Sequence, residues 1–164
     1  MRQRLPVVLV FLLLAIPARV FAKADISEIK IQGGDLKTPI VIADPKTLPH
    51  FNVWTGPGTS GPLTKETRFI IDWSKKVTER AYGLQRYQVS FYAKFPDERL
   101  IYVVFYEYDP ATEQGYIYLP GRGDEWYRVN VGTIFRGVEG RWFRATSEWD
   151  KFARPLILDA KAQS

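Results

Sequence analysis

The sequence predicts an all-β protein: an antiparallel β-sandwich or a curled meander sheet of about eight short strands, with one short C-terminal helix. Three observations predict this class. Apolar and polar residues alternate in several separate segments, turns rich in Gly, Pro and Asp divide these segments, and a clear helical pattern occurs only near the C-terminus. The chain of 164 residues is long enough for one compact domain, which we place at 25–164.

The first 24 residues have the pattern of a secretory signal peptide. Arg2 and Arg4 precede a 12-residue apolar run, and small residues follow it. The run is shorter than the roughly 20 apolar residues of a membrane-spanning helix. We therefore expect cleavage before either Lys23 or Asp25, no membrane span afterwards, and an exported protein that is periplasmic or extracellular.

Three short strands are expected in the N-terminal half of the mature chain. Isoleucines alternate with polar residues at 28–32, which is typical of a strand at a sheet edge, and a second apolar segment follows at 39–43. Alternation at 68–73 predicts the third strand. The Gly- and Pro-rich segment 55–62 is expected to be a loop, as is 74–83, with at most one or two helical turns.

The centre of the chain gives the strongest strand pattern. Residues 87–95 alternate with a period of two, with apolar side chains on one face and polar side chains on the other. After a turn at Pro96, residues 99–106 are apolar on both faces and rich in β-branched and aromatic types. This composition predicts a central strand that is covered on two sides.

Three more strands are expected to continue the sheet as a meander. They lie at 116–119, 126–135 and 141–145, and Gly132 is expected to form a bend or a bulge in the second of them. Short turns between successive strands favour antiparallel neighbours.

A short helix is expected to follow the last strand. The segment Ser147-Glu-Trp-Asp150 resembles a capping box, and apolar residues at Trp149, Phe152 and Ala153 lie on one side of the helix. Pro155 is expected to end it.

The composition excludes several kinds of chemistry. There is no cysteine, which excludes disulfides and thiolate catalysis, and the single histidine, His50, stands in no recognisable catalytic motif. We therefore expect no metal site and no cofactor. Four basic residues lie before Ala24, so the rest of the chain carries 19 basic and 18 acidic residues, and no nucleic acid partner is expected.

Several segments resemble a group of short exported bacterial proteins without assigned function. The segments are 51–58, 102–121, 124–128 and 132–142, so the resemblance covers most of the mature chain. It implies a bacterial exported protein. It implies no activity and no site residue.

Aromatic residues are the most unusual feature of the chain, which has five tryptophans and nine tyrosines. Rings exposed in a row on a β face form a stacking platform for sugar rings or peptide side chains. The leading hypothesis is a non-enzymatic domain that binds carbohydrate or polypeptide through such rings, and the alternative is that they fill the core. The six candidate residues lie along adjacent predicted strands: Tyr102, Tyr106, Tyr116, Tyr118, Trp126 and Tyr127.

Carboxylates suggest a second hypothesis, a glycosidase-like hydrolase. Glu107, Asp109 and Glu113 cluster at the end of the central strand, and Asp124 and Glu125 lie in the next loop. Glu107 follows an apolar run, so it is expected to be buried and to need an arginine partner. The candidate partners are Arg128, Arg136 and Arg144.

A third hypothesis is a structural or assembly component of the cell envelope. In this case the long apolar strand at 99–106 pairs with another chain. The oligomeric state stays open.

Overall fold

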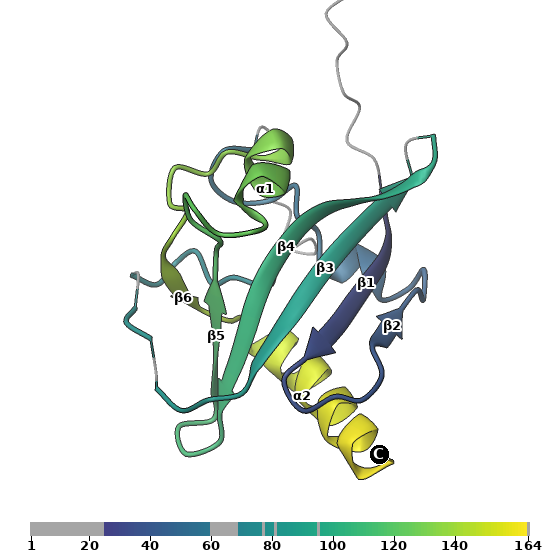
Figure 1. Cartoon of the computed structure of the whole chain (residues 1–164), viewed down its shortest axis with the longest axis vertical. Coiled ribbons are helices and arrows are strands. Elements are labelled where there is room, and N and C mark those ends of the chain that lie inside the picture. Colours follow the sequence, from purple (N-terminus) through teal and green to yellow (C-terminus); the bar gives the residue numbers. More distant parts are fainter. Residues whose placement is uncertain (1–24, 60–68, 77, 81, 95, 164) are drawn as a thin grey trace, which may run out of the picture.

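One antiparallel sheet of six strands, in the order β2-β1-β3-β4-β5-β6, forms the body of the protein (Figure 1). The computed structural model describes residues 25–59, 69–76, 78–80, 82–94 and 96–163. The predicted signal peptide lies outside the described residues, as does the end of the loop 55–62. The strands are β1 (Ile26–Gly33), β2 (Ile40–Ile42), β3 (Arg86–Lys94), β4 (Glu98–Asp109), β5 (Gln114–Tyr118) and β6 (Trp142–Arg144).

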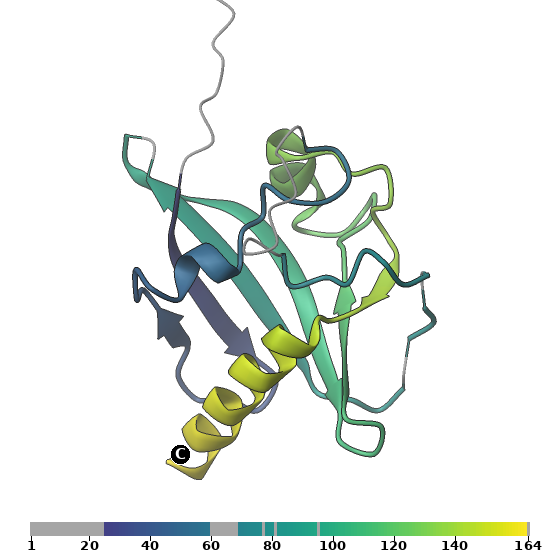
Figure 2. The same cartoon turned by 180° about the vertical axis from the view of Figure 1, so that it is seen from behind.

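The predicted antiparallel meander is confirmed in β3 to β6, where each strand pairs with the next one along the chain. The strand count and the sandwich are not confirmed, because the described residues form six strands in one sheet. A helix and loops, rather than a second sheet, cover one face (Figure 2). The strand at 28–32 is internal and not at an edge, because β1 pairs with β2 on one side and with β3 on the other.

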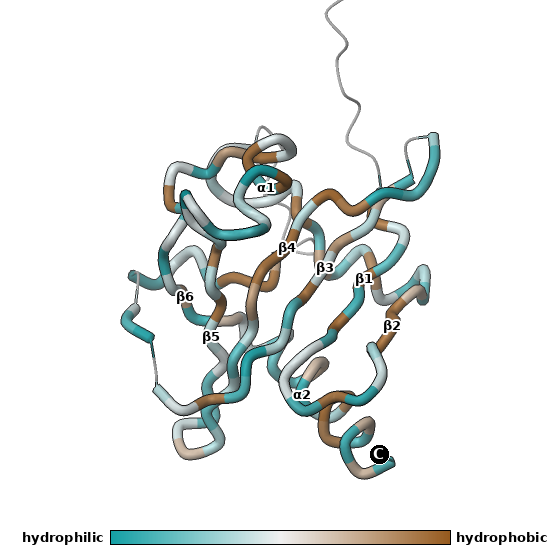
Figure 3. Tube along the Cα trace, viewed as in Figure 1, coloured by the Kyte–Doolittle hydropathy of each residue, from teal (hydrophilic) through white to brown (hydrophobic). Residues whose placement is uncertain are grey.

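β4 is the central strand that the sequence predicts. It pairs with β3 on one side and β5 on the other, and hydrophobic residues lie along much of its length (Figure 3). The short strands β2 and β6 form the sheet edges instead. β3 pairs with β4 from Glu98 to Glu107, and β5 pairs with it from Phe105 to Asp109. Pairing of this strand with another chain stays a prediction.

The core lies between the sheet and the helix α2 (Ser147–Ala162), which crosses one face of the sheet (Figure 2). The short 3₁₀ helix η1 (Leu48–His50) and the segments around residues 51–55 and 69–73 complete this layer. Trp149 is fully buried at its centre and meets Phe51 edge to face at 5.0 Å between ring centroids. The opposite face of the sheet, seen from the front in Figure 1, is not covered by α2, and we call it the uncovered face, although Val103 and Glu107 on it are buried.

α2 begins one residue earlier than expected and continues past its proline. Thr146 is the N-cap, and its Oγ1 accepts a hydrogen bond from Trp149 N at 3.2 Å. The expectation that Pro155 ends the helix is wrong. Proline removes one backbone donor, but Trp149, Ala153 and Ile157 are buried on one side and hold the helix to the sheet before and after Pro155.

The expected strand at 126–135 is wrong, because this segment forms the helix α1 (Tyr127–Thr133). Its buried residue Asn130 explains the difference. Asn130 Nδ2 donates to Val103 O at 2.7 Å, and Asn130 Oδ1 accepts from Val103 N at 2.8 Å. The amide thereby bonds the edge of β4 beyond the end of β5, and a helix is the conformation that brings it there.

Gly132 gives a direct test of this helix, where the sequence suggested a strand with a bulge. Gly132→Ala should raise the free energy of unfolding by about 0.5 kcal/mol, because alanine favours helix and a Cβ at this position meets nothing within 4 Å. Urea denaturation followed by tryptophan fluorescence measures the change.

Gly137→Ala is the matched control, since its Cβ also meets nothing within 4 Å but its φ is +74°. It should destabilise by about 1 kcal/mol, because L-residues disfavour this backbone region. A destabilising Gly132→Ala would contradict the helix.

The remaining expectations fall on loops. Phe69, Ile70 and Ile71 are buried, but the only strand-like pairing of 69–73 is an isolated bridge between Ile71 and Ala145. The segment 74–83 is a loop, as predicted, in its described residues, and an isolated bridge joins Thr78 to Trp142.

None of the helices in the described part of the chain is long and apolar enough to cross a membrane.

Candidate functional site

The six predicted platform residues do not form one surface. Tyr102 and Tyr106 are fully buried on the face that α2 covers, so for these two the core alternative is correct. Tyr102 OH accepts from Arg136 Nε at 2.8 Å, and Tyr106 OH donates to Asp150 Oδ1 at 2.8 Å. Burial raises the pKa of both hydroxyls, and neither ring is open to a ligand.

The other four candidates are half-buried and belong to two places. Tyr116 and Tyr118 lie on β5, on the face opposite to α2, because their neighbour Ile117 points into the core. Trp126 and Tyr127 lie at the start of α1. Only Tyr116 and Tyr118 therefore lie on the uncovered face of the sheet.

The strand register places three half-buried rings side by side on this uncovered face. Tyr118 is opposite Phe105 on β4 and opposite Trp142 on β6. The ring centroids of Phe105 and Tyr118 are 6.4 Å apart, and those of Tyr118 and Trp142 are 5.1 Å apart. Phe105 and Trp142 are thus site residues that sequence reasoning missed, and only the register between strands reveals them.

Two arginines lie against these rings. The guanidinium carbon of Arg86 is 5.5 Å from the Phe105 ring centroid and 5.4 Å from that of Trp142. The guanidinium carbon of Arg80, in the loop before β3, is 5.8 Å from the Trp142 ring centroid. We call these five residues, Phe105, Tyr118, Trp142, Arg80 and Arg86, the aromatic–arginine surface.

Glu107 holds the two arginines in place. Its side chain is fully buried, and Oε1 accepts from Arg86 Nε at 2.8 Å and from Arg80 Nη2 at 3.4 Å. The expected burial and arginine pairing are confirmed, but the partners are not Arg128, Arg136 or Arg144. Register explains the correction, because Arg86 lies directly opposite Glu107 on β3.

Two other predicted carboxylates, Asp109 and Asp124, are hydrogen-bonded within their own turns. Asp109 accepts from Ala111 N and Thr112 Oγ1 in its own turn, and these bonds lower its pKa. Asp124 Oδ2 accepts from Tyr118 OH at 2.8 Å and from Gly121 N at 2.7 Å, while Glu125 is exposed. Both bonded carboxylates therefore fix local turns.

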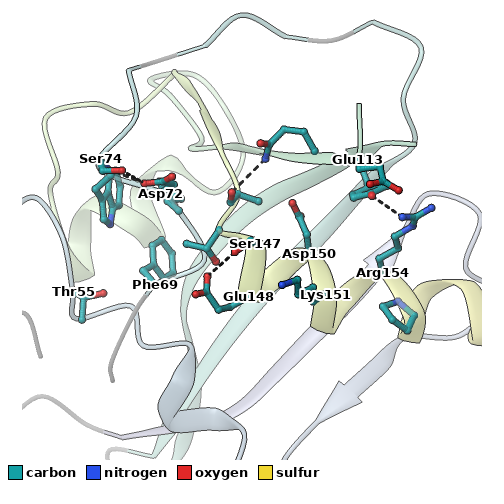
Figure 4. A pocket seen from close by; sticks show the side chains of 17 residues that line it. Thr55, Phe69, Asp72, Ser74, Glu113, Ser147, Glu148, Asp150, Lys151 and Arg154 are labelled. Carbon is teal, nitrogen blue, oxygen red and sulfur yellow. Dashed lines mark hydrogen bonds between the residues drawn. The ribbon is translucent and has the colours of Figure 1, made fainter. Parts of the chain in front are cut away.

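A cavity of about 960 Å³ lies on the other side of the molecule, along the first half of α2 (Figure 4). Of the five predicted carboxylates, only Glu113 lines it, together with three acids that the sequence did not single out: Asp72, Glu148 and Asp150. In the described part of the chain, no group of three or more His, Asp or Glu is placed to hold a metal ion.

Asp150 is a structural acid of this cavity. Its Oδ1 accepts from Tyr106 OH, and its Oδ2 accepts from Gly115 N at 2.9 Å. Burial raises the pKa of Asp150, so its ionisation costs stability as the pH rises through that pKa. A Cβ at Gly115 would collide with Asp150 Oδ1, which shows how closely the carboxylate packs on β5.

The uncovered face therefore carries aromatic rings next to two arginines. The carboxylates that line the cavity, in contrast, include groups that are already hydrogen-bonded to other residues of the protein. Asp72, for example, accepts from the backbone and the hydroxyl of Ser74.

Comparison with known proteins does not identify a relative of this chain. No protein-family model, no curated protein and no solved structure matches it.

Proposed function

We propose that this protein is an exported, non-enzymatic binding domain that holds a carbohydrate on the aromatic–arginine surface. One observation carries the proposal: Phe105, Tyr118 and Trp142 form a row on the uncovered sheet face, with Arg80 and Arg86 against the rings.

The row has the properties that sugar binding needs. Ring faces stack on the C–H faces of sugars, and neighbouring N–H and O–H groups bond to sugar hydroxyls. The rings sit on three hydrogen-bonded strands, so little conformational freedom is lost on binding. A surface that follows a sheet face suits an extended oligosaccharide better than a small ligand, which needs a concave pocket.

The strand edges favour carbohydrate over polypeptide. Proteins that bind peptides on sheets commonly add the peptide as a new edge strand. Beside this surface, β6 is the edge, and Thr78 N already donates to Trp142 O at 3.0 Å. The edge of β4 beyond β5 is bonded by Asn130. Both neighbouring edges therefore already carry hydrogen bonds, at Trp142 and at Val103.

A glycan array followed by titration calorimetry on the array hits tests the proposal. Trp142→Ala and Tyr118→Ala should each weaken binding about tenfold or more, because each removes a stacking ring. Circular dichroism checks that both variants fold.

Phe135→Ala is the matched control, since Phe135 is 63% exposed but lies outside the surface. It should bind like the unchanged protein. The proposal fails if the array shows no binding, if a peptide library binds instead, or if folded Trp142→Ala binds as well as the unchanged protein.

A further inference from the structure

We infer that the carbohydrate is acidic, and that its carboxylate binds the guanidinium groups of Arg80 and Arg86. The chemical class is an oligosaccharide of uronic acids, in which each pyranose ring carries a carboxylate. This inference rests on the proposed function and names the ligand class of the same surface.

The first argument is charge. Arg80 and Arg86 both bind the same oxygen of Glu107, so the cluster carries one more positive than negative charge. Glu107 is fully buried, whereas the arginine side chains are 40% and 38% exposed. The excess charge therefore faces the uncovered side of the sheet, where it attracts an anion.

The second argument is the number of arginine N–H groups that do not bond Glu107. Each guanidinium carries several N–H groups, and in the described part of the chain each gives one to Glu107 Oε1. The remaining N–H groups are available at a half-exposed position. Arginine and carboxylate form planar, two-pronged hydrogen bonds, so the remaining N–H groups of the two guanidinium groups suit a carboxylate.

The third argument is the position of the cations relative to the rings. Arg86 lies 5.4 Å from the Trp142 ring centroid, so an anion bound to Arg86 lies beside a stacking face. A uronic acid has its carboxylate directly on the sugar ring, which meets this short spacing. The far end of Tyr118 is unsuitable for the anion, because its hydroxyl already donates to the carboxylate of Asp124.

Titration calorimetry with matched ligands tests the inference. The ligands are oligogalacturonate and oligoglucuronate, each compared with its methyl ester, which keeps the rings and removes the charge. We expect the acids to bind about tenfold more tightly than the esters. This preference should shrink at roughly 0.5 M salt, where charge interactions are screened.

Two variants locate the preference. Arg80→Gln removes one cation, and the double variant Arg86→Gln/Glu107→Gln removes the second without leaving a buried charge. Both should reduce the preference for the acids to less than about threefold. Arg128→Gln, an exposed arginine on α1, is the control and should keep the full preference.

The outcomes separate the two proposals. If esters bind as tightly as acids and binding still depends on Trp142, the carbohydrate function stands and the acidic ligand is wrong. A sulfated oligosaccharide that outcompetes the uronates would also overturn the acidic-sugar assignment. If no sugar of either charge binds here or on the array, both proposals fail.

Discussion

Arg136→Met should lower the free energy of unfolding by about 4 kcal/mol, because it removes a buried cation that joins three parts of the protein. Arg136 is 5% exposed. Its Nε donates to Tyr102 OH, Nη1 to Thr55 O and Pro57 O, and Nη2 to Val53 O, at 2.6 to 3.0 Å.

Without this side chain, three carbonyls of the segment 53–57 lose their donor. Each buried polar group without a partner costs about 1–3 kcal/mol, and water restores part of this. The guanidinium also packs on aromatic rings, since its carbon lies 4.9 Å from the Phe69 ring centroid and 5.1 Å from that of Trp73. Methionine fills some of this space but makes none of the hydrogen bonds.

Chemical denaturation followed by tryptophan fluorescence measures the loss, and two variants control it. Arg128→Met removes an exposed arginine and should change stability by less than about 0.5 kcal/mol. Arg136→Lys keeps the charge but not the fork of donors, so it should remain destabilising by about 2 kcal/mol. If Arg136→Met costs less than about 1 kcal/mol, the segment 53–57 is held by other contacts.

Local patterns in the sequence predict the strands well where packing and propensity agree. The alternation at 87–95 gives β3, and the apolar segment 99–106 gives the centre of β4. In α1 and α2, packing and local propensity disagree. Val129 and Val131 favour a strand, but the segment forms a helix whose buried Asn130 amide bonds Val103. Pro155 favours a helix end, but core contacts on both sides of it continue the helix.

The sequence indicates which types of residue form the candidate site, but not which particular residues lie together. The excess of aromatic residues predicts rings on a β face, which stays a prediction as a binding platform, and the position of Glu107 after an apolar run predicts its burial next to an arginine. Which rings share a face depends on strand register. Tyr106 and Phe105 are neighbours in sequence, yet Tyr106 lies under α2 and Phe105 lies beside Tyr118 on the other face. One sequence without the pairing of its strands does not contain that information.

Arg86→Met should lower the free energy of unfolding by about 3 kcal/mol, because it leaves the buried carboxylate of Glu107 with its weaker partner alone. Arg86 Nε is 2.8 Å from Glu107 Oε1, whereas Arg80 Nη2 is 3.4 Å away and its side chain is 40% exposed. Oε2 of Glu107 is buried and has no hydrogen-bond partner in the described part of the chain, so it offers no compensation.

The reverse substitution should cost much less. Glu107→Gln removes the charge that cannot reach water and leaves two arginines that can, so we expect a loss of about 1 kcal/mol. In the double variant Arg86→Met/Glu107→Gln, no buried charge remains, and stability should recover by about 2 kcal/mol relative to Arg86→Met. A double-mutant cycle from urea denaturation measures this coupling. Additive effects of the two substitutions would show that the buried carboxylate does not depend on Arg86, and that Arg80 alone neutralises it.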